Sequence, residues 1–223
     1  MRLLDELAAA VGTLTIVPAA TPPSPALRVA SLASFPLVGL LLGMAAAATT
    51  ALVGGWSPTL AAVTGVGLLT VVSGGSVSGA LAPRLGVLGW AARAIAVGCK
   101  IWSAVALPPS AFVLPPMLSR WAIVVQCYGG RAAPGDDPAS AVVGRAGFRE
   151  FGWASVLGIG LPLAATEAVG LVLVLAVALT TVATRMIGYR HTPRSATWLV
   201  AVTAELTEVV AFVTLGTLAR TAG

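Results

Sequence analysis

Charged side chains are scarce in this chain, and their scarcity excludes an ordinary soluble domain. Only 9% of the 223 residues are Asp, Glu, Lys or Arg, whereas 57% are apolar. A soluble fold of this length has too little interior to hide that much apolar surface. The sequence therefore predicts a protein that places apolar side chains in lipid.

Cysteine and histidine are also scarce, which narrows the possible metal and redox chemistry. Cys99 lies inside an apolar segment and Cys127 ends another. We expect both to be reduced, buried side chains and not a disulfide or a metal site. His191 is the single histidine and lies in a basic loop. We expect it at the surface, with a general-base role as the alternative.

Seven apolar segments separated by short turns predict an all-α polytopic membrane bundle, with residues 1–223 as a single transmembrane domain. They cover about 31–53, 58–73, 85–107, 111–127, two parts of 152–184, and 197–218. As one helix, 152–184 would be about 50 Å long, which exceeds a bilayer core, so a turn is expected near Ala165 to Ala168, with Glu167 solvated there. An amphipathic segment is expected over 3–17.

Basic residues alternate between the gaps, as the positive-inside rule describes. Nine of the 13 Lys and Arg residues fall in every second gap: Arg2, Arg28, Arg84, Arg131, Arg145, Arg149, Arg185, Arg190 and Arg194. The rule places these gaps in the cytoplasm. Because the arginines are spread over several short loops, the pattern does not favour nucleic-acid binding.

Five charged residues lie inside the apolar segments, where an ionised group needs a partner or a wet cavity. They are Arg93, Lys100, Arg120, Glu205 and Glu208. Counted from the cytoplasmic ends, Arg93, Arg120 and Glu205 share a depth of about 10 to 12 Å, and Glu208 is one turn deeper than Glu205. We expect an internal cluster open to the cytoplasm. The alternative is that these charges only neutralise one another and fix the helix register.

Several segments, in order, resemble one family. They are LTIVP (14–18), SFPLVGLLLG (34–43), PRLGVLG (83–89) followed by Lys100, LSRWAIVVQCYGGRAAPG (118–135) and AELTEVVAF (204–212). They are similar to the motifs of the membrane-bound adenosylcobinamide-GDP ribazoletransferases, also called cobalamin (5'-phosphate) synthases.

The resemblance implies a reaction and a location. Family members join α-ribazole or its 5'-phosphate to adenosylcobinamide-GDP and release GMP, with Mg²⁺, and the expected location is the bacterial inner membrane. This phosphoryl transfer needs oxygen ligands for the cation and cationic groups for the phosphates. Arg84, Arg93, Lys100 and Arg120 are the candidates for the cationic groups, and Glu205 is the fifth candidate catalytic residue.

The sequence departs from the family at the expected metal ligands. Members carry an aspartate-rich loop before the third span, whereas this chain has SGGSVSGALAPR (73–84), which contains no acidic residue. Glu205 and Glu208, spaced i and i+3, are the candidate replacements. Asp136 and Asp137 are the alternative, although beside Gly135 and Pro138 a solvated turn is the simpler reading.

Three functions remain open at the level of sequence. The first is an active ribazoletransferase with a reduced metal site. The second is a catalytically lapsed member that binds cobamide precursors or a membrane partner, alone or as an oligomer. The third, an unrelated small transporter, would need inverted repeats, and the sequence shows none.

The arginine pattern leads to a prediction about orientation. In a background without Cys99 and Cys127, a cysteine placed at Ser140 should react only with reagents that reach the cytoplasm, because the loop over 129–150 carries three arginines. Labelling of that cysteine from the outside of intact cells would contradict the orientation.

Overall fold

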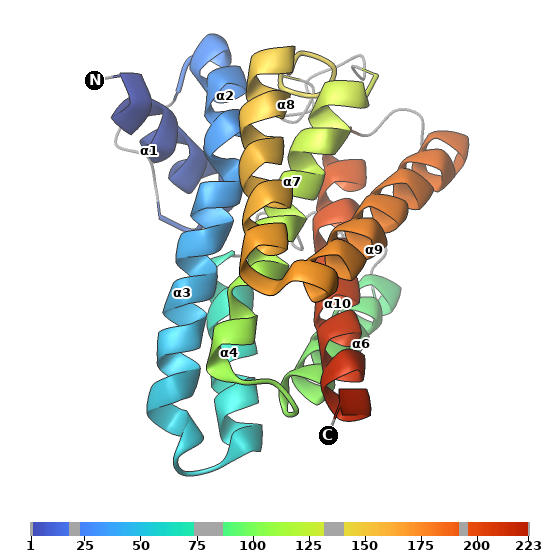
Figure 1. Cartoon of the computed structure of the whole chain (residues 1–223). Coiled ribbons are helices and arrows are strands. Elements are labelled where there is room, and N and C mark those ends of the chain that lie inside the picture. The colour runs from blue at the N-terminus through green and yellow to red at the C-terminus, as the bar shows by residue number, and fades with distance from the viewer. Residues whose placement is uncertain (1, 18–22, 74–86, 132–140, 192–195, 223) are drawn as a thin grey trace.

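The computed structural model describes residues 2–17, 23–73, 87–131, 141–191 and 196–222, and all regular elements in these ranges are helices (Figure 1). The long helices are α3 (Phe35–Gly54), α4 (Pro58–Val72), α6 (Val87–Ala104), α7 (Leu114–Gly129), α9 (Leu161–His191) and α10 (Ala196–Ala222). The shorter ones are α1 (Arg2–Leu14), α2 (Pro25–Ser31), α8 (Phe148–Ser155), the 3₁₀ turns η1 (Leu32–Ser34) and η2 (Pro109–Phe112), and the π-helical turn η4 (Val156–Gly160). The predicted all-α membrane bundle is confirmed.

Serine caps and prolines start two of the helices. Ser24 Oγ accepts a hydrogen bond from the Leu27 N–H at 3.2 Å, ahead of Pro25 at the first position of α2. Ser57 caps α4 in the same way, with Pro58 next to it. The serine oxygen satisfies an N–H that has no partner inside the helix, and proline has the backbone angle that the first turn requires. The uncharged turn before residue 58 is thereby fixed by local chemistry.

Helix α7 lies at the centre of the bundle. Thirteen of its 16 residues are buried, and it contacts α3, α8, α9 and α10. By contrast, only 22% of the apolar 18-residue stretch within Phe148–Arg190 is buried inside the bundle. Large side chains such as Leu52 and Leu179 point away from the bundle. Most outward-facing apolar surface therefore belongs to the peripheral helices, which is the arrangement expected in lipid.

The predicted apolar segments are all helical, but they differ as membrane spans. In the part of the chain that the structure describes, four helical stretches are long and apolar enough to cross a bilayer: Pro25–Gly54, Pro109–Gly129, Phe148–Arg190 and Trp198–Thr221. Helix α4 is shorter, with 15 residues. The sequence predicted about seven spans, one of them short; the membrane bundle is confirmed, with four candidate spans in the described residues.

The stretch from α8 to α9 reverses direction, as the sequence predicted. Glu167 has non-helical backbone angles (φ 45°, ψ −114°) and is exposed. Gly170 permits the tight return, because a Cβ there would lie 2.2 Å from the carbonyl oxygen of Pro162. Figure 1 shows this turn about halfway along the bundle and not at its far end. The α8–α9 hairpin thus enters and leaves at the same end.

The ends of the helices support the arginine pattern. Figure 1 shows α1, the start of α2, the end of α7 and the start of α8 at one end of the bundle, while the α3–α4 turn and the C-terminus lie at the other. The expected helix near the N-terminus is present as α1, and Arg149 pairs with Glu6 at 3.0 Å. The helices that carry Arg2, Arg28 and Arg149 therefore have these residues on one side, called here the arginine-bearing end, whereas Arg220 lies at the other end with the C-terminus. The cytoplasmic location of the arginine-bearing end stays a prediction.

Two sequence expectations need adjustment in detail. Arg185 and Arg190 belong to the last turns of α9, which continues to His191, so the basic segment is helical for longer than predicted. Cys127 is buried and free as expected, and Cys99 is free but only half-buried.

The contact between α3 and α7 leads to a prediction about stability. A Cβ at Gly39 would lie 2.5 Å from the Pro116 carbonyl oxygen and 2.7 Å from Met117 Cα, which are backbone atoms that cannot rotate away. Gly39→Ala should lower the free energy of unfolding by about 1 to 3 kcal/mol through overpacking. The measurement is the midpoint of thermal unfolding in detergent, which should fall. Gly67→Ala is the control, because nothing lies within 4 Å of its Cβ position. Equal stability of the two variants would contradict the close α3–α7 approach.

Candidate functional site

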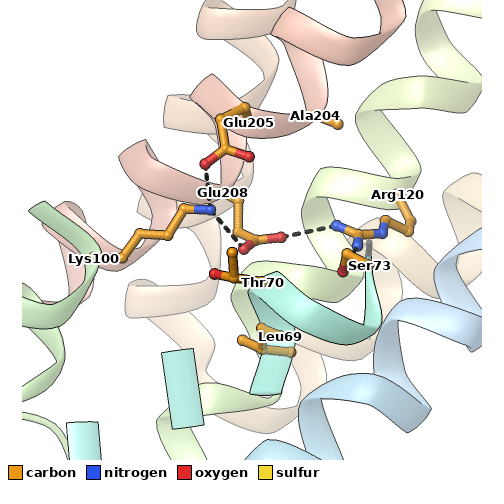
Figure 2. Close-up of a pocket in the computed structure, with 8 residues that line it drawn as sticks. All are labelled: Leu69, Thr70, Ser73, Lys100, Arg120, Ala204, Glu205 and Glu208. Carbon is orange, nitrogen blue, oxygen red and sulfur yellow. Dashed lines mark hydrogen bonds and ion pairs between the residues drawn. The ribbon is translucent and has the colours of Figure 1, made fainter. Parts of the chain in front are cut away.

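A charged pocket lies where the C-terminal end of α4 meets α6, α7 and α10 (Figure 2). Its polar lining residues are Thr70, Ser73, Lys100, Arg120, Glu205 and Glu208, with Leu69 and Ala204 completing it. The cavity measures about 20 Å³, which is room for about one water molecule. Four helices thus meet around one small space, and three of them, α6, α7 and α10, supply its charged groups.

Glu208 is the central residue of this pocket. One carboxylate oxygen, Oε1, accepts from Lys100 Nζ at 2.9 Å, and the other, Oε2, accepts from the Arg120 guanidinium at 2.8 Å. The Ser119 hydroxyl also lies 3.3 Å from Oε2. Only 7% of the Glu208 side chain is exposed, so its charge is stabilised by these donors and not by water. The carboxylate joins α10 to α6 and α7.

Lys100 forms a second ion pair, with Glu205. The two groups are 2.7 Å apart, and Lys100 is 3% exposed whereas Glu205 is 19% exposed. Glu205 precedes Glu208 by three residues, so both carboxylates project from the same face of α10. The ammonium group therefore lies between two carboxylates, as Figure 2 shows.

Arg120 connects the ion pairs to the end of α4. Its guanidinium donates to Ser119 Oγ at 2.6 Å and also to Ser73 Oγ. The side chain is only 2% exposed. Within the described residues, its Nε atom is buried and has no hydrogen-bond partner. Ser73 is the first residue of the SGGSVSGALAPR segment, so Arg120 reaches the place where the family resemblance fails.

The structure brings together four of the charged residues that the sequence singled out: Lys100, Arg120, Glu205 and Glu208. Arg93 does not line the pocket, and its guanidinium lies 5.7 Å from the ring centre of Trp90 on its own helix. The expected cluster of Arg93, Arg120 and Glu205 therefore forms with Lys100 in place of Arg93. The count along the sequence placed Arg93 at the depth of Arg120 and Glu205. In the structure that position belongs to Lys100, which lies about two turns beyond Arg93 on α6.

The other candidates cannot be placed. Arg84, Asp136 and Asp137 lie outside the described residues, as does the side chain of His191. The sequence reasoning missed Ser73, Thr70 and Ser119. The available signals were the serine next to Arg120 and the serine at the end of α4. Serine and threonine are too common in membrane helices to be selected without coordinates.

A second buried polar cluster connects α7, α9 and α10 nearer the arginine-bearing end. Gln126 donates to the Thr203 hydroxyl at 2.9 Å and to the Thr181 carbonyl at 3.0 Å, and it accepts from Arg185 Nε at 2.8 Å. Each heavy atom of the Gln126 amide is thereby bonded, which makes the cluster a structural connection and not an open site. The sequence analysis did not single out Gln126.

The magnesium ion implied by the resemblance does not fit the Glu205 and Glu208 pair as it stands. Mg²⁺ requires six oxygen ligands in octahedral geometry at about 2.0 to 2.1 Å. Here three of the four carboxylate oxygens already accept from Lys100 or Arg120. Within the described part of the chain, no group of three or more His, Cys, Asp or Glu residues is suited to hold a metal. The pair that the sequence favoured as ligands is therefore engaged by cationic side chains.

The ion-pair geometry leads to a prediction about stability. Glu208→Gln should destabilise the protein by about 3 to 5 kcal/mol, because it leaves both Lys100 and Arg120 without their shared buried carboxylate. Glu205→Gln is the matched control and should cost less, since Glu205 is more exposed and pairs with one cation. Thermal unfolding of both variants in the same detergent measures the difference. A larger loss in the Glu205 variant would contradict the central role of Glu208.

The comparisons with known proteins give one match. A family model described as cobalamin-5-phosphate synthase matches residues 6–77 and 81–218. These ranges include every residue that lines the charged pocket. No curated protein and no solved structure matches the chain. Since the family model covers nearly the whole chain, the protein belongs to the cobalamin-5-phosphate synthase family and has a role in cobalamin biosynthesis.

Proposed function

We propose that the protein acts at the ribazoletransferase step of late cobalamin biosynthesis, where it binds the phosphate-bearing precursor adenosylcobinamide-GDP and has weak transferase activity of its own. The observation that carries this proposal is the pair of buried cations, Lys100 and Arg120, gathered at the end of α4 within a chain of this family. Cationic groups held in a poorly solvated site attract phosphate oxygens strongly.

The geometry of Arg120 supports a role in binding a phosphate. Its guanidinium is held by Glu208, Ser119 and Ser73, so its plane is fixed before any ligand arrives. Its Nε atom has no partner among the described residues, which leaves one donor for an incoming acceptor. Because the cavity holds about one water, the pocket must widen to admit a diphosphate.

A catalytically lapsed member is the second candidate, and two observations favour it. The two carboxylates of the pocket are paired with cations, and the segment over 73–84 has no acidic residue. Under this alternative the protein binds the precursor, or supports a partner enzyme in the membrane, without turnover. Both candidates share precursor binding and differ only in chemistry.

Complementation of a strain that lacks the transferase provides the functional test. We expect growth on the cobalamin-dependent medium to be weakly restored or not restored, because the remaining acids are few and the described ones in the pocket are paired. Robust restoration would refute the weak-activity proposal. If robust growth were then lost in Glu205→Gln but kept in Asp136→Asn, the metal site of an active enzyme would lie on α10.

The purified protein separates the two candidates. In lipid nanodiscs with α-ribazole and Mg²⁺, turnover of adenosylcobinamide-GDP would identify a slow enzyme, and binding without turnover would identify the lapsed member. Arg120→Lys should weaken precursor binding at least tenfold, because lysine cannot reproduce the planar fork of donors. Arg93→Lys is the matched control outside the pocket. Unchanged binding in the Arg120 variant would contradict the phosphate role.

A further inference from the structure

The relation between Lys100 and the two glutamates carries a further inference about cation use. Lys100 Nζ lies 2.7 Å from a Glu205 oxygen and 2.9 Å from a Glu208 oxygen. A cation that bridges two carboxylates on one helix face occupies the position that a divalent metal would take. Lys100 supplies this cation from α6, and only 3% of its side chain is exposed to solvent.

We infer that the Lys100 ammonium is the resident cation of the Glu205 and Glu208 pair, in place of a divalent metal. The inference rests on the proposed function only in taking this pocket as the functional site. It deepens that proposal by naming the cation that the two carboxylates hold. It predicts that divalent ions do not bind at this pair in the wild-type protein.

Charge balance in the pocket supports a lysine ammonium in place of a divalent metal. Two positive groups, Lys100 and Arg120, face two negative groups, Glu205 and Glu208, so the cluster is neutral as it stands. An added dication would leave a net charge of two in a low-dielectric region, beside an ammonium of like sign. The space is also insufficient, because a magnesium ion normally keeps several water ligands and the cavity has room for about one.

Geometry indicates that the metal position is latent and not lost. Glu205 and Glu208 remain one turn apart on the same face of α10, and the Ser119 hydroxyl lies 3.3 Å from Glu208. If the lysine charge were removed without shortening the side chain greatly, the cluster would carry one net negative charge, because Arg120 alone would face the two carboxylates. Such a site should then recruit a divalent cation.

Manganese binding tests the inference without any precursor. Full-length protein in phosphatidylcholine nanodiscs is titrated with Mn²⁺, and bound ion is measured by the loss of the free-ion electron paramagnetic resonance signal. Wild type and Glu205→Gln should bind equal amounts, which corrects for ions held elsewhere. Lys100→Met should gain about one bound Mn²⁺ per chain, and Lys100→Met with Glu205→Gln should lose that gain. Arg93→Met, which removes a cation from the same helix outside the pocket, should gain none.

Each result has a definite consequence. Binding in the wild type that Glu205→Gln abolishes would overturn the inference, because the carboxylates would then hold a metal beside Lys100. A folded Lys100→Met variant that gains no Mn²⁺ would also overturn it. If Lys100→Met fails to fold, the comparison of wild type with Glu205→Gln still decides the question. Since adenosylcobinamide-GDP is absent from the experiment, its outcome is independent of precursor binding and turnover.

Discussion

The neutralisation of buried charge is the constraint on which this structure depends. Four ionisable side chains, Lys100, Arg120, Glu205 and Glu208, meet around one small pocket, and Glu208 contacts both cations of the group. An unpaired charge at such depth costs several kcal/mol, so the helices that carry the charges must meet. The contact of Glu208 with Lys100 and Arg120 therefore fixes α6 and α7 against α10, and Arg120 also reaches Ser73 at the end of α4.

The same pairing determines what chemistry the pocket offers. Carboxylates that accept from ammonium and guanidinium groups are poor ligands for an added dication, whereas the cations they hold are fixed and partly desolvated. Such cations suit the recognition of phosphate oxygens. On the proposed function, this pocket supplies the cationic part of a phosphate site, whereas the segment over 73–84 contains no acidic residue.

The rest of the bundle supports this pocket from two directions. The Gln126 cluster holds α7 to α9 and α10 through three hydrogen bonds nearer the arginine-bearing end. On the other face, Gly39 lets α3 approach α7 until a single methyl group would collide with the α7 backbone, and Gly43 does the same against residues 112–113, just before α7. Small residues that permit close approach and polar residues that bond across helices are the two means by which membrane helices associate. Both kinds of contact involve α7, the helix that carries Arg120.

The sequence alone determined the class of the fold and the positions of most of its helical segments. Apolar composition and alternating arginines are additive signals that depend on the transfer of side chains between water and lipid. The Ser-Pro helix starts are local signals that depend on backbone hydrogen bonding and proline geometry. For this reason the apolar segments, the reversal near Glu167 and the need of internal charges for partners could be predicted without coordinates. The family could be recognised as well, because ordered motifs survive in the chain even where its aspartates do not.

Only the tertiary structure decided which charges meet. Spacing along a helix placed Glu205 and Glu208 on one face, but the identity of the partner depends on the start, tilt and rotation of a different helix, and a displacement of two turns exchanges Arg93 for Lys100. Ser73 and Ser119 likewise become part of the site only through the packing of α4, α7 and α10. Such contacts join residues up to 108 positions apart, and the local pattern of a sequence does not encode the relative rotation of helices so distant along the chain.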